Sequence, residues 1–98
     1  MRKPTNDISE KQGRAINSDN YAEFYLTYDL GCSSALVSSG FELVSLDKSN
    51  PKKVQFIFRR ETGIEKVADD YFADRLSLKA RGFFDNIKSI KNRLYSSE

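Results

Sequence analysis

The stretch FELVSLDKSNPKKVQFIFRR, residues 41–60, contains two runs of strand-forming residues that flank a turn. Residues 41–47 and residues 53–60 are both rich in branched and aromatic side chains, which pack well on a pleated sheet. The KSNPK segment between them supplies the Asn and Pro that are typical of turns. The stretch therefore predicts a β-hairpin.

The two faces of the second strand differ in chemistry. Successive side chains of a strand point to opposite faces, so Val54, Phe56 and Phe58 share one face. We expect that face to meet helices in the core and the basic face to meet solvent. The basic face carries Lys53, Gln55, Ile57 and Arg59.

The residues before the hairpin predict a strand and a helix. YAEFYLTY, residues 21–28, alternates with a period of two, and its second face shows Tyr21 and Tyr25. Asp29 is a good N-cap for a short helix because its carboxylate can accept a hydrogen bond from a free N–H of the first turn. Gly40 is suited to end that helix in a left-handed conformation.

The residues after the hairpin predict two helices and a short strand. Thr62 and Glu65 match a capping box, and apolar residues at helical spacing predict a helix over residues 63–73. LSLK, residues 76–79, is a short strand that could pair with a second subunit through its free edge. A last helix over residues 81–95 has one apolar line. That line consists of Phe83, Ile87, Ile90 and Leu94.

The order of these elements gives the fold class. It predicts a split βαββαβ-like α+β layer, with one antiparallel or mixed sheet, helices packed on one face, and an additional C-terminal helix. Residues 21–98 are expected to form a single domain. Residues 1–20 hold few apolar residues and no sustained period, which predicts a flexible N-terminal arm.

The run TYDLGCSSALVSSGFELVSLDKSNPKKVQFIF resembles a small family of uncharacterised domains found in bacteria, archaea and their phages. In that family a Thr-x-Asp-Leu start precedes an Ala-Leu helix, a Gly-Phe turn, and an Asn-Pro hairpin that leads to a Phe-x-Phe strand. The resemblance extends over residues 24–94. It implies the fold and a mobile-element context. No function is established for the family, so no functional residues carry over.

Composition argues against an enzyme or a metal protein. The chain of 98 residues has no His, and Cys32 is its one cysteine, so zinc sites of the Cys and His type are excluded. Asp69, Asp70 and Asp74 form the densest group of carboxylates in the sequence. We interpret them as part of a solvent-exposed helix face rather than as a metal site. Cys32 is interpreted as a buried thiol, with a redox role as the alternative. We expect no catalytic residue, no metal and no cofactor.

Two further features bear on location. The N-terminus has no apolar leader, and the chain has no long apolar run, so neither a signal peptide nor a membrane span is expected. A lone cysteine forms no internal disulfide, which fits a reducing compartment. We therefore expect a cytoplasmic protein without a membrane partner.

Charge segregation indicates a binding surface, although the net charge is only +2. Residues 51–66 hold five basic and two acidic residues, whereas residues 21–50 hold one basic and four acidic residues. Cations of this kind beside tyrosine rings are typical of single-strand binders, in which lysine and arginine contact phosphates and rings stack on bases. The candidate nucleic-acid-binding residues are Tyr21, Tyr25, Lys52, Lys53, Arg59, Arg60, Lys88, Lys91 and Arg93.

The last helix adds a stripe of basic and aromatic residues, Phe84, Lys88, Lys91 and Tyr95, which has two interpretations. In the favoured one, both rings widen the apolar face of the helix while the lysines extend over its edge. In the other, the stripe is a second binding surface.

The leading prediction is a small non-enzymatic nucleic-acid-binding domain for single-stranded DNA or RNA. The strand order is that of RNA-recognition motifs, but the glycines of their signature are missing after Lys53. The alternative is a protein-interaction accessory factor of a phage, a mobile element or a host complex, since polar rims around a few tyrosines also suit protein docking.

Overall fold

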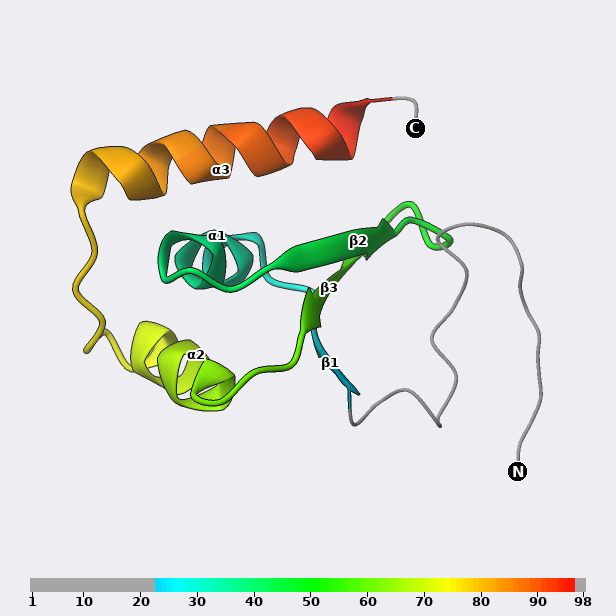
Figure 1. The fold of residues 1–98 in the computed structure, drawn as a ribbon. Helices are drawn as coiled ribbons and strands as arrows, with labels where there is room; N and C mark the ends of the chain where they lie inside the picture. Colours follow the sequence, from blue (N-terminus) through cyan, green and yellow to red (C-terminus); the bar gives the residue numbers. More distant parts are fainter. Residues whose placement is uncertain (1–22, 97–98) are drawn as a thin grey trace.

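Three strands and three helices make up residues 23–96, the part of the chain that the computed structural model describes (Figure 1). In chain order they are β1 (Phe24–Thr27), α1 (Leu30–Ser38), β2 (Leu43–Asp47), β3 (Gln55–Arg59), α2 (Ile64–Phe72) and α3 (Ala80–Tyr95). The predicted arm over residues 1–20 and the predicted stacking residue Tyr21 lie outside the described residues.

β3 is the central strand of the sheet, which has the order β1-β3-β2. Both neighbours pair antiparallel with β3, so β1 and β2 run parallel to each other. α1 connects these two parallel strands, and β3 lies between them, which is a split βαβ unit. The hairpin and the α+β class predicted from the sequence are confirmed.

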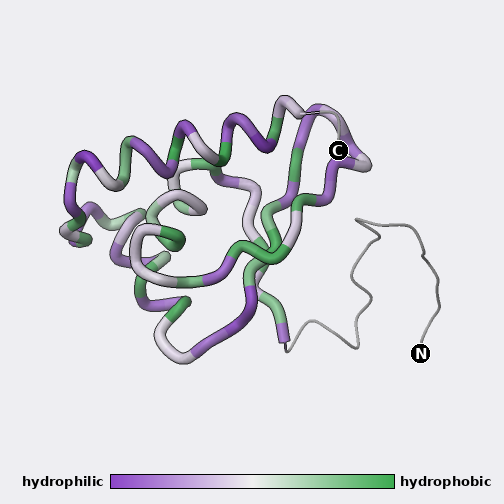
Figure 2. Tube along the Cα trace, turned by 45° about the horizontal axis from the view of Figure 1, so that its top comes forward, coloured by the Kyte–Doolittle hydropathy of each residue, from purple (hydrophilic) through white to green (hydrophobic). Residues whose placement is uncertain are grey.

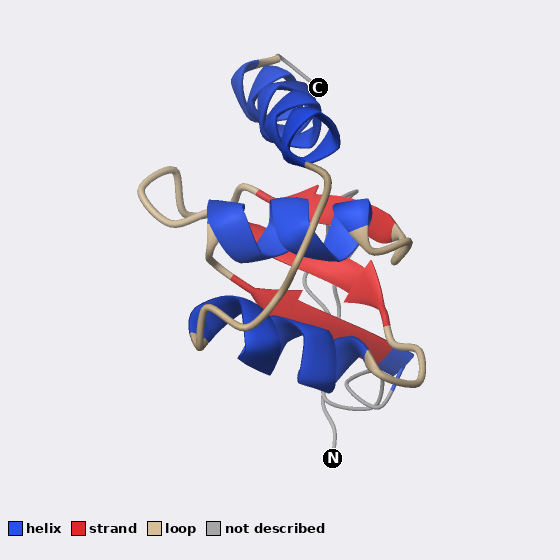
Figure 3. Cartoon of the chain, turned by 90° about the vertical axis from the view of Figure 1, so that its left-hand side faces the viewer, coloured by secondary structure: helices blue, strands red, loops and turns tan. Residues whose placement is uncertain are grey.

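The helices cover one face of the sheet. α1 and α2 lie over the strands, and α3 packs on α1 (Figure 3). Phe56 and Phe58 reach into this layer as their alternation predicts, and Ile90 brings α3 into the same core. In Figure 2 the long helix at the top alternates between hydrophobic and hydrophilic residues, as expected of a helix buried along one side. The buried core cluster consists of Cys32, Leu36, Phe56, Phe58, Ile64, Ala68 and Ile90.

Both ends of α1 form as the sequence predicts. The Oδ1 atom of Asp29 accepts a hydrogen bond from the backbone N–H of Cys32 at 2.7 Å, which satisfies a free donor of the first turn. Gly40 follows the last turn with a φ of 100°, a conformation that L side chains rarely adopt. The Phe41 N–H then donates to the Leu36 carbonyl at 3.0 Å, as in a Schellman motif.

Two predictions for the C-terminal half are wrong. The N-cap of α2 is Gly63, which has a φ of 92°, rather than Thr62. Glu65 pairs with Arg60 instead of completing a capping box. Residues 76–79 are irregular rather than a strand. They cross from α2 to α3 on the side of the helices away from the sheet, where no neighbouring strand is available (Figure 1).

Candidate nucleic-acid interface

The sheet face predicted to carry stacking rings is arranged differently in the structure. Tyr25 pairs with Phe58, so its ring lies on the helix-covered face and packs against the core. Burial raises the pKa of Tyr25, and the nearby Cys32 and Asp69 raise it further. Ile57 lies on the opposite face, yet only 1% of it is exposed. The predicted placement of Tyr25 on an open face is wrong, because pairing with β3 rather than alternation alone decides which face is buried.

Arg59 and Arg60 are engaged by glutamates at one end of β3. Nε of Arg59 donates to Glu42 Oε1 at 3.0 Å, and this bond is the main reason that the pKa of Arg59 is raised. Arg60 forms an ion pair with Glu65, and its Nη2 donates to the Phe24 carbonyl at 3.2 Å. A phosphate would have to compete with these partners. We call this region the glutamate end; it comprises Arg59, Arg60, Glu23, Glu42, Glu61 and Glu65.

The other end of β3 presents two lysines without an acidic partner among residues 23–96. Lys52 and Lys53 lie in the exposed turn between β2 and β3, and no described carboxylate forms an ion pair with either. Nζ of Lys53 lies 4.7 Å from the centroid of the Tyr28 ring, a cation–π contact. Tyr28 is 53% exposed. We call Tyr28, Lys52 and Lys53 the hairpin contact.

Tyr28 is a surface residue that the alternation of residues 21–28 did not predict. The alternation over residues 21–28 assigned it to the same face as Phe24 and Leu26. In the structure β1 ends at Thr27, so the alternation stops one residue earlier. The signal was Asp29: because it caps α1, the chain leaves the strand immediately before it.

One side of α3 combines exposed rings with lysines. Phe84 is 57% exposed and Tyr95 is 78% exposed, and Nζ of Lys88 lies 5.4 Å from the centroid of the Phe84 ring. The favoured interpretation, in which these rings widen the apolar face, is wrong. α3 packs through a line that includes Ile90, which is 3% exposed, and the rings lie beyond its edge. We call Phe84, Lys88, Lys91 and Tyr95 the α3 stripe.

Arg93 is separated from the other predicted cations of α3. Residues two apart on a helix do not face the same side, so Arg93 and Lys91 lie on different flanks. The Arg93 side chain is half-buried, and its carbonyl accepts a hydrogen bond from Lys48 Nζ at 3.0 Å. The same Nζ donates to the Ser96 carbonyl at 3.3 Å. The structure therefore brings Lys88 and Lys91 together and leaves Arg93 apart.

Lys48 ties the hairpin to the end of α3, a role that nothing in the sequence indicated. It precedes the turn between β2 and β3, and it is 45 residues from the carbonyl of Arg93 that it binds. A cation at the C-terminus of a helix also interacts favourably with the helix dipole. Figures 1 and 2 show from two directions that the hairpin turn lies beside the last turn of α3.

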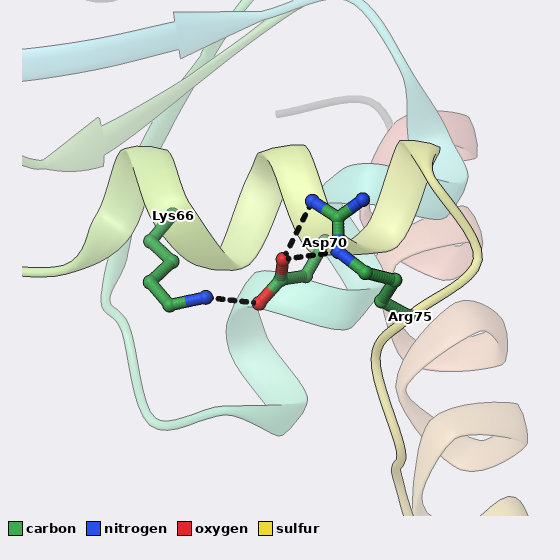
Figure 4. A network of polar contacts seen from close by, with 3 residues as sticks. All are labelled: Lys66, Asp70 and Arg75. Carbon is green, nitrogen blue, oxygen red and sulfur yellow. Dashed lines mark hydrogen bonds and ion pairs between the residues drawn. The ribbon is translucent and has the colours of Figure 1, made fainter.

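Asp70 of α2 is the centre of an ion-pair network with Lys66 and Arg75 (Figure 4). The Asp70 carboxylate accepts a hydrogen bond from Lys66 Nζ at 2.9 Å, and it forms an ion pair with Arg75 Nη2 at 3.0 Å. The bond from Lys66, with that from Arg75, holds the pKa of Asp70 below its usual value. Within residues 23–96 no group of three Cys, Asp or Glu side chains is placed to hold a metal ion.

Cys32 is the buried thiol that the sequence analysis favoured. It is fully buried, and burial, with a smaller contribution from Asp29, raises its pKa to about 11. A thiol with that pKa stays protonated at neutral pH and is a poor nucleophile, because the thiolate is the reactive form.

None of the helices within residues 23–96 is long and apolar enough to cross a bilayer.

Comparison with known proteins identifies a family but no activity. No curated protein and no solved structure matches the chain. The model of a family described as Domain of unknown function (DUF5659) matches residues 20–96, which include every described strand and helix, the hairpin contact and the α3 stripe. The resemblance to an uncharacterised family is thereby confirmed. The chain belongs to this family, the domains of unknown function DUF5659.

Proposed function

We propose that the domain binds single-stranded nucleic acid through the α3 stripe. One observation carries the proposal: two rings that are more than half exposed, Phe84 and Tyr95, share one side of a helix with two lysines that have no acidic partner among the described residues. Large exposed rings in a small domain that has a packed core are available for a ligand.

The chemistry of the stripe suits unpaired bases on a phosphate backbone. A base stacked on an aromatic side chain contributes about 1–3 kcal/mol, and each lysine that neutralises a phosphate releases counterions. Tyr95 follows Phe84 by eleven positions, a rise of about 16 Å along the helix. Lys88 and Lys91 lie between the two rings in the sequence, so two phosphate contacts fall between two base contacts along the stripe.

A duplex is a poorer ligand for this surface. Its bases are stacked on one another, so Phe84 and Tyr95 cannot reach their flat faces without unstacking them. The lysines could still contact duplex phosphates, but only the electrostatic part of the interaction would remain. We therefore expect single-stranded probes to bind more tightly than duplex probes of the same length.

The test is a fluorescence anisotropy titration with single-stranded DNA, single-stranded RNA and duplex DNA at two salt concentrations. The informative variant is Lys88→Gln with Lys91→Gln. The matched control is Arg59→Gln with Arg60→Gln, which removes the same net charge from the glutamate end. Circular dichroism melts of both variants establish that each one folds.

At about 0.1 M salt each phosphate contact on a single strand contributes about 0.7 log units to affinity, so losing two costs about 25-fold. We expect this loss in the Lys88/Lys91 variant, together with a salt slope that is shallower by about 1.4. The Arg59/Arg60 control is expected to stay within about threefold of the parent, because its cations already have glutamate partners. Equal losses in the two variants would refute the assignment to α3. No saturable binding of the parent chain to any probe would refute the proposed function and favour protein docking on the same rings.

A further inference from the structure

We infer that the hairpin contact and the α3 stripe bind one strand of nucleic acid at the same time, with Lys48 holding the two surfaces in position. This inference rests on the proposed function. It adds a second contact region to that function, and it assigns Tyr28 a stacking role that no pattern in the sequence indicated.

The hairpin contact has the same chemistry as the α3 stripe. In each, an exposed ring lies beside a lysine: Lys53 Nζ is 4.7 Å from the Tyr28 centroid, and Lys88 Nζ is 5.4 Å from the Phe84 centroid. Lys52 adds a second exposed cation beside Lys53. Both regions therefore bring a stacking ring and phosphate partners close together in space, which is the combination that single-strand binders use.

The acidic groups close to the hairpin contact are already engaged. The Oδ1 atom of Asp29 accepts the backbone N–H of Cys32 at 2.7 Å. The Oδ1 atom of Asp47 accepts the hydroxyl of Ser49 at 2.7 Å and its backbone N–H at 3.0 Å. These carboxylates hold local turn and cap hydrogen bonds rather than pairing with Lys52 or Lys53.

The bond from Lys48 fixes where the hairpin lies. Its Nζ donates to the Arg93 carbonyl at 3.0 Å and to the Ser96 carbonyl at 3.3 Å, so the turn is anchored at the C-terminus of α3. Tyr95 lies in that same last turn of the helix. The turn that carries Lys52 and Lys53 therefore lies beside the end of α3 at which the stripe terminates (Figure 1).

Electrostatics favours the same path. The glutamate end lies at the opposite end of β3 from the turn, and it brings four glutamates around two arginines. A phosphate backbone is repelled there and attracted to the turn, where Lys52 and Lys53 are exposed and Lys48 contacts the end of α3. Two linked contacts on one strand then act as a bivalent interaction, in which the second contact forms at a high effective concentration.

The test compares thymidine oligonucleotides of about 4 and about 16 nucleotides, a range that spans known single-strand site sizes. A short strand fits on the α3 stripe alone, whereas a long strand reaches both regions. The hairpin variant is Tyr28→Ala with Lys53→Gln, and the α3 variant is Phe84→Ala with Lys88→Gln. Labelled RNA of the same lengths and anionic lipid vesicles are included as further probes.

For the long strand we expect each variant to weaken binding about tenfold or more, which corresponds to the loss of one stacked base. For the short strand we expect the hairpin variant to bind within about twofold of the parent and the α3 variant to lose binding. If the hairpin variant binds both lengths as the parent does, the inference is overturned while the proposed function stands. If the parent binds neither length, or binds only the vesicles, the proposed function fails and the inference fails with it.

Lys48 is tested as a positioning residue with Lys48→Met and Lys48→Arg. In the Met background, the effect of the hairpin variant on the long strand should fall from about tenfold to about twofold, because the two regions no longer act together. In the Lys48→Arg background the hairpin variant should still weaken binding of the long strand about tenfold, since arginine can donate to the carbonyls of Arg93 and Ser96. Binding of the short strand reports that α3 itself is intact in both backgrounds. An unchanged effect of the hairpin variant in the Met background would overturn the role of Lys48.

Discussion

Replacing Gly31 with alanine should destabilise the domain through a single contact between α1 and α2. A methyl group built at Gly31 would overlap the hydroxyl oxygen of Tyr71, and it would lie 3.0 Å from Cζ of that ring and 3.3 Å from Oδ1 of Asp29. Asp29 cannot yield freely because its carboxylate caps α1. Either the Tyr71 ring or the whole of α2 must therefore move.

The magnitude follows from two opposing effects. Overpacking in a packed interior costs about 1–3 kcal/mol, whereas replacing glycine by alanine in a helix contributes up to about 1 kcal/mol in favour of folding. We expect a net loss of about 1–2 kcal/mol in the free energy of unfolding. For a domain of this size that corresponds to a melting temperature lower by about 5–15 °C.

Two matched variants isolate the cause. Gly82 lies in the first turn of α3, and a methyl group built there meets no atom within 4 Å, so Gly82→Ala should raise the free energy of unfolding by about 0.5–1 kcal/mol. Tyr71→Phe removes the overlapping hydroxyl, and it should restore most of the stability that Gly31→Ala loses.

The assay is urea unfolding followed by far-ultraviolet circular dichroism for the parent, the three single variants and the Gly31→Ala/Tyr71→Phe double variant. The reasoning is refuted if Gly31→Ala is as stable as the parent. It is also refuted if the double variant loses as much free energy of unfolding as the sum of the losses of Gly31→Ala and Tyr71→Phe. The loss in Gly31→Ala would then not arise at the Tyr71 hydroxyl.

Three further predictions concern ionisation and backbone conformation. The ion pairs of Asp70 lower its pKa, so the stability that they provide is present above the unfolded pKa of about 3.9 and is lost as pH falls through the folded pKa. Asp70→Asn should therefore flatten the fall in the urea unfolding midpoint between about pH 5 and pH 2. Asp74 has a φ of 60°, so Asp74→Gly should raise the free energy of unfolding by about 0.5–1 kcal/mol, measured by urea unfolding, and a loss would contradict the assignment of backbone strain. Cys32 should resist a thiol-modifying reagent in the native protein at neutral pH and react fully in urea, whereas rapid native labelling would contradict its burial and raised pKa.

Much of the fold could be predicted because its signals are local. The hairpin follows from two strand-forming runs on either side of a turn, and α1 is bounded by a cap residue and a glycine that act within a few positions. The alternation of Phe56 and Phe58 was enough to place the core face of β3. These features depend on neighbours in the sequence, and the structure confirms them.

The errors arise where distant residues decide the outcome. Tyr25 belongs to the core face because it pairs with Phe58, and alternation within β1 carries no information about that pairing. Residues 76–79 have a strand-like pattern, but they find no partner strand on the path from α2 to α3.

The candidate site depended on distant contacts in the same way. Glu42, the partner of Arg59, is 17 residues away in the sequence. The charge count over residues 51–66 included Glu65 but could not show that it pairs with Arg60. Lys48 was overlooked because its contact is made with the end of α3. The α3 stripe itself was visible from helical spacing, but its exposure depended on how α3 packs against α1.

The central claim is that single strands bind the α3 stripe rather than the glutamate end. The most direct measurement is a titration of the isotope-labelled full chain with a thymidine oligonucleotide, followed by backbone amide chemical shifts. We expect the largest shifts at Phe84, Lys88, Lys91 and Tyr95, and small shifts at Arg59 and Arg60. Shifts concentrated at Arg59 and Arg60, or no shifts at saturating oligonucleotide, would contradict the account.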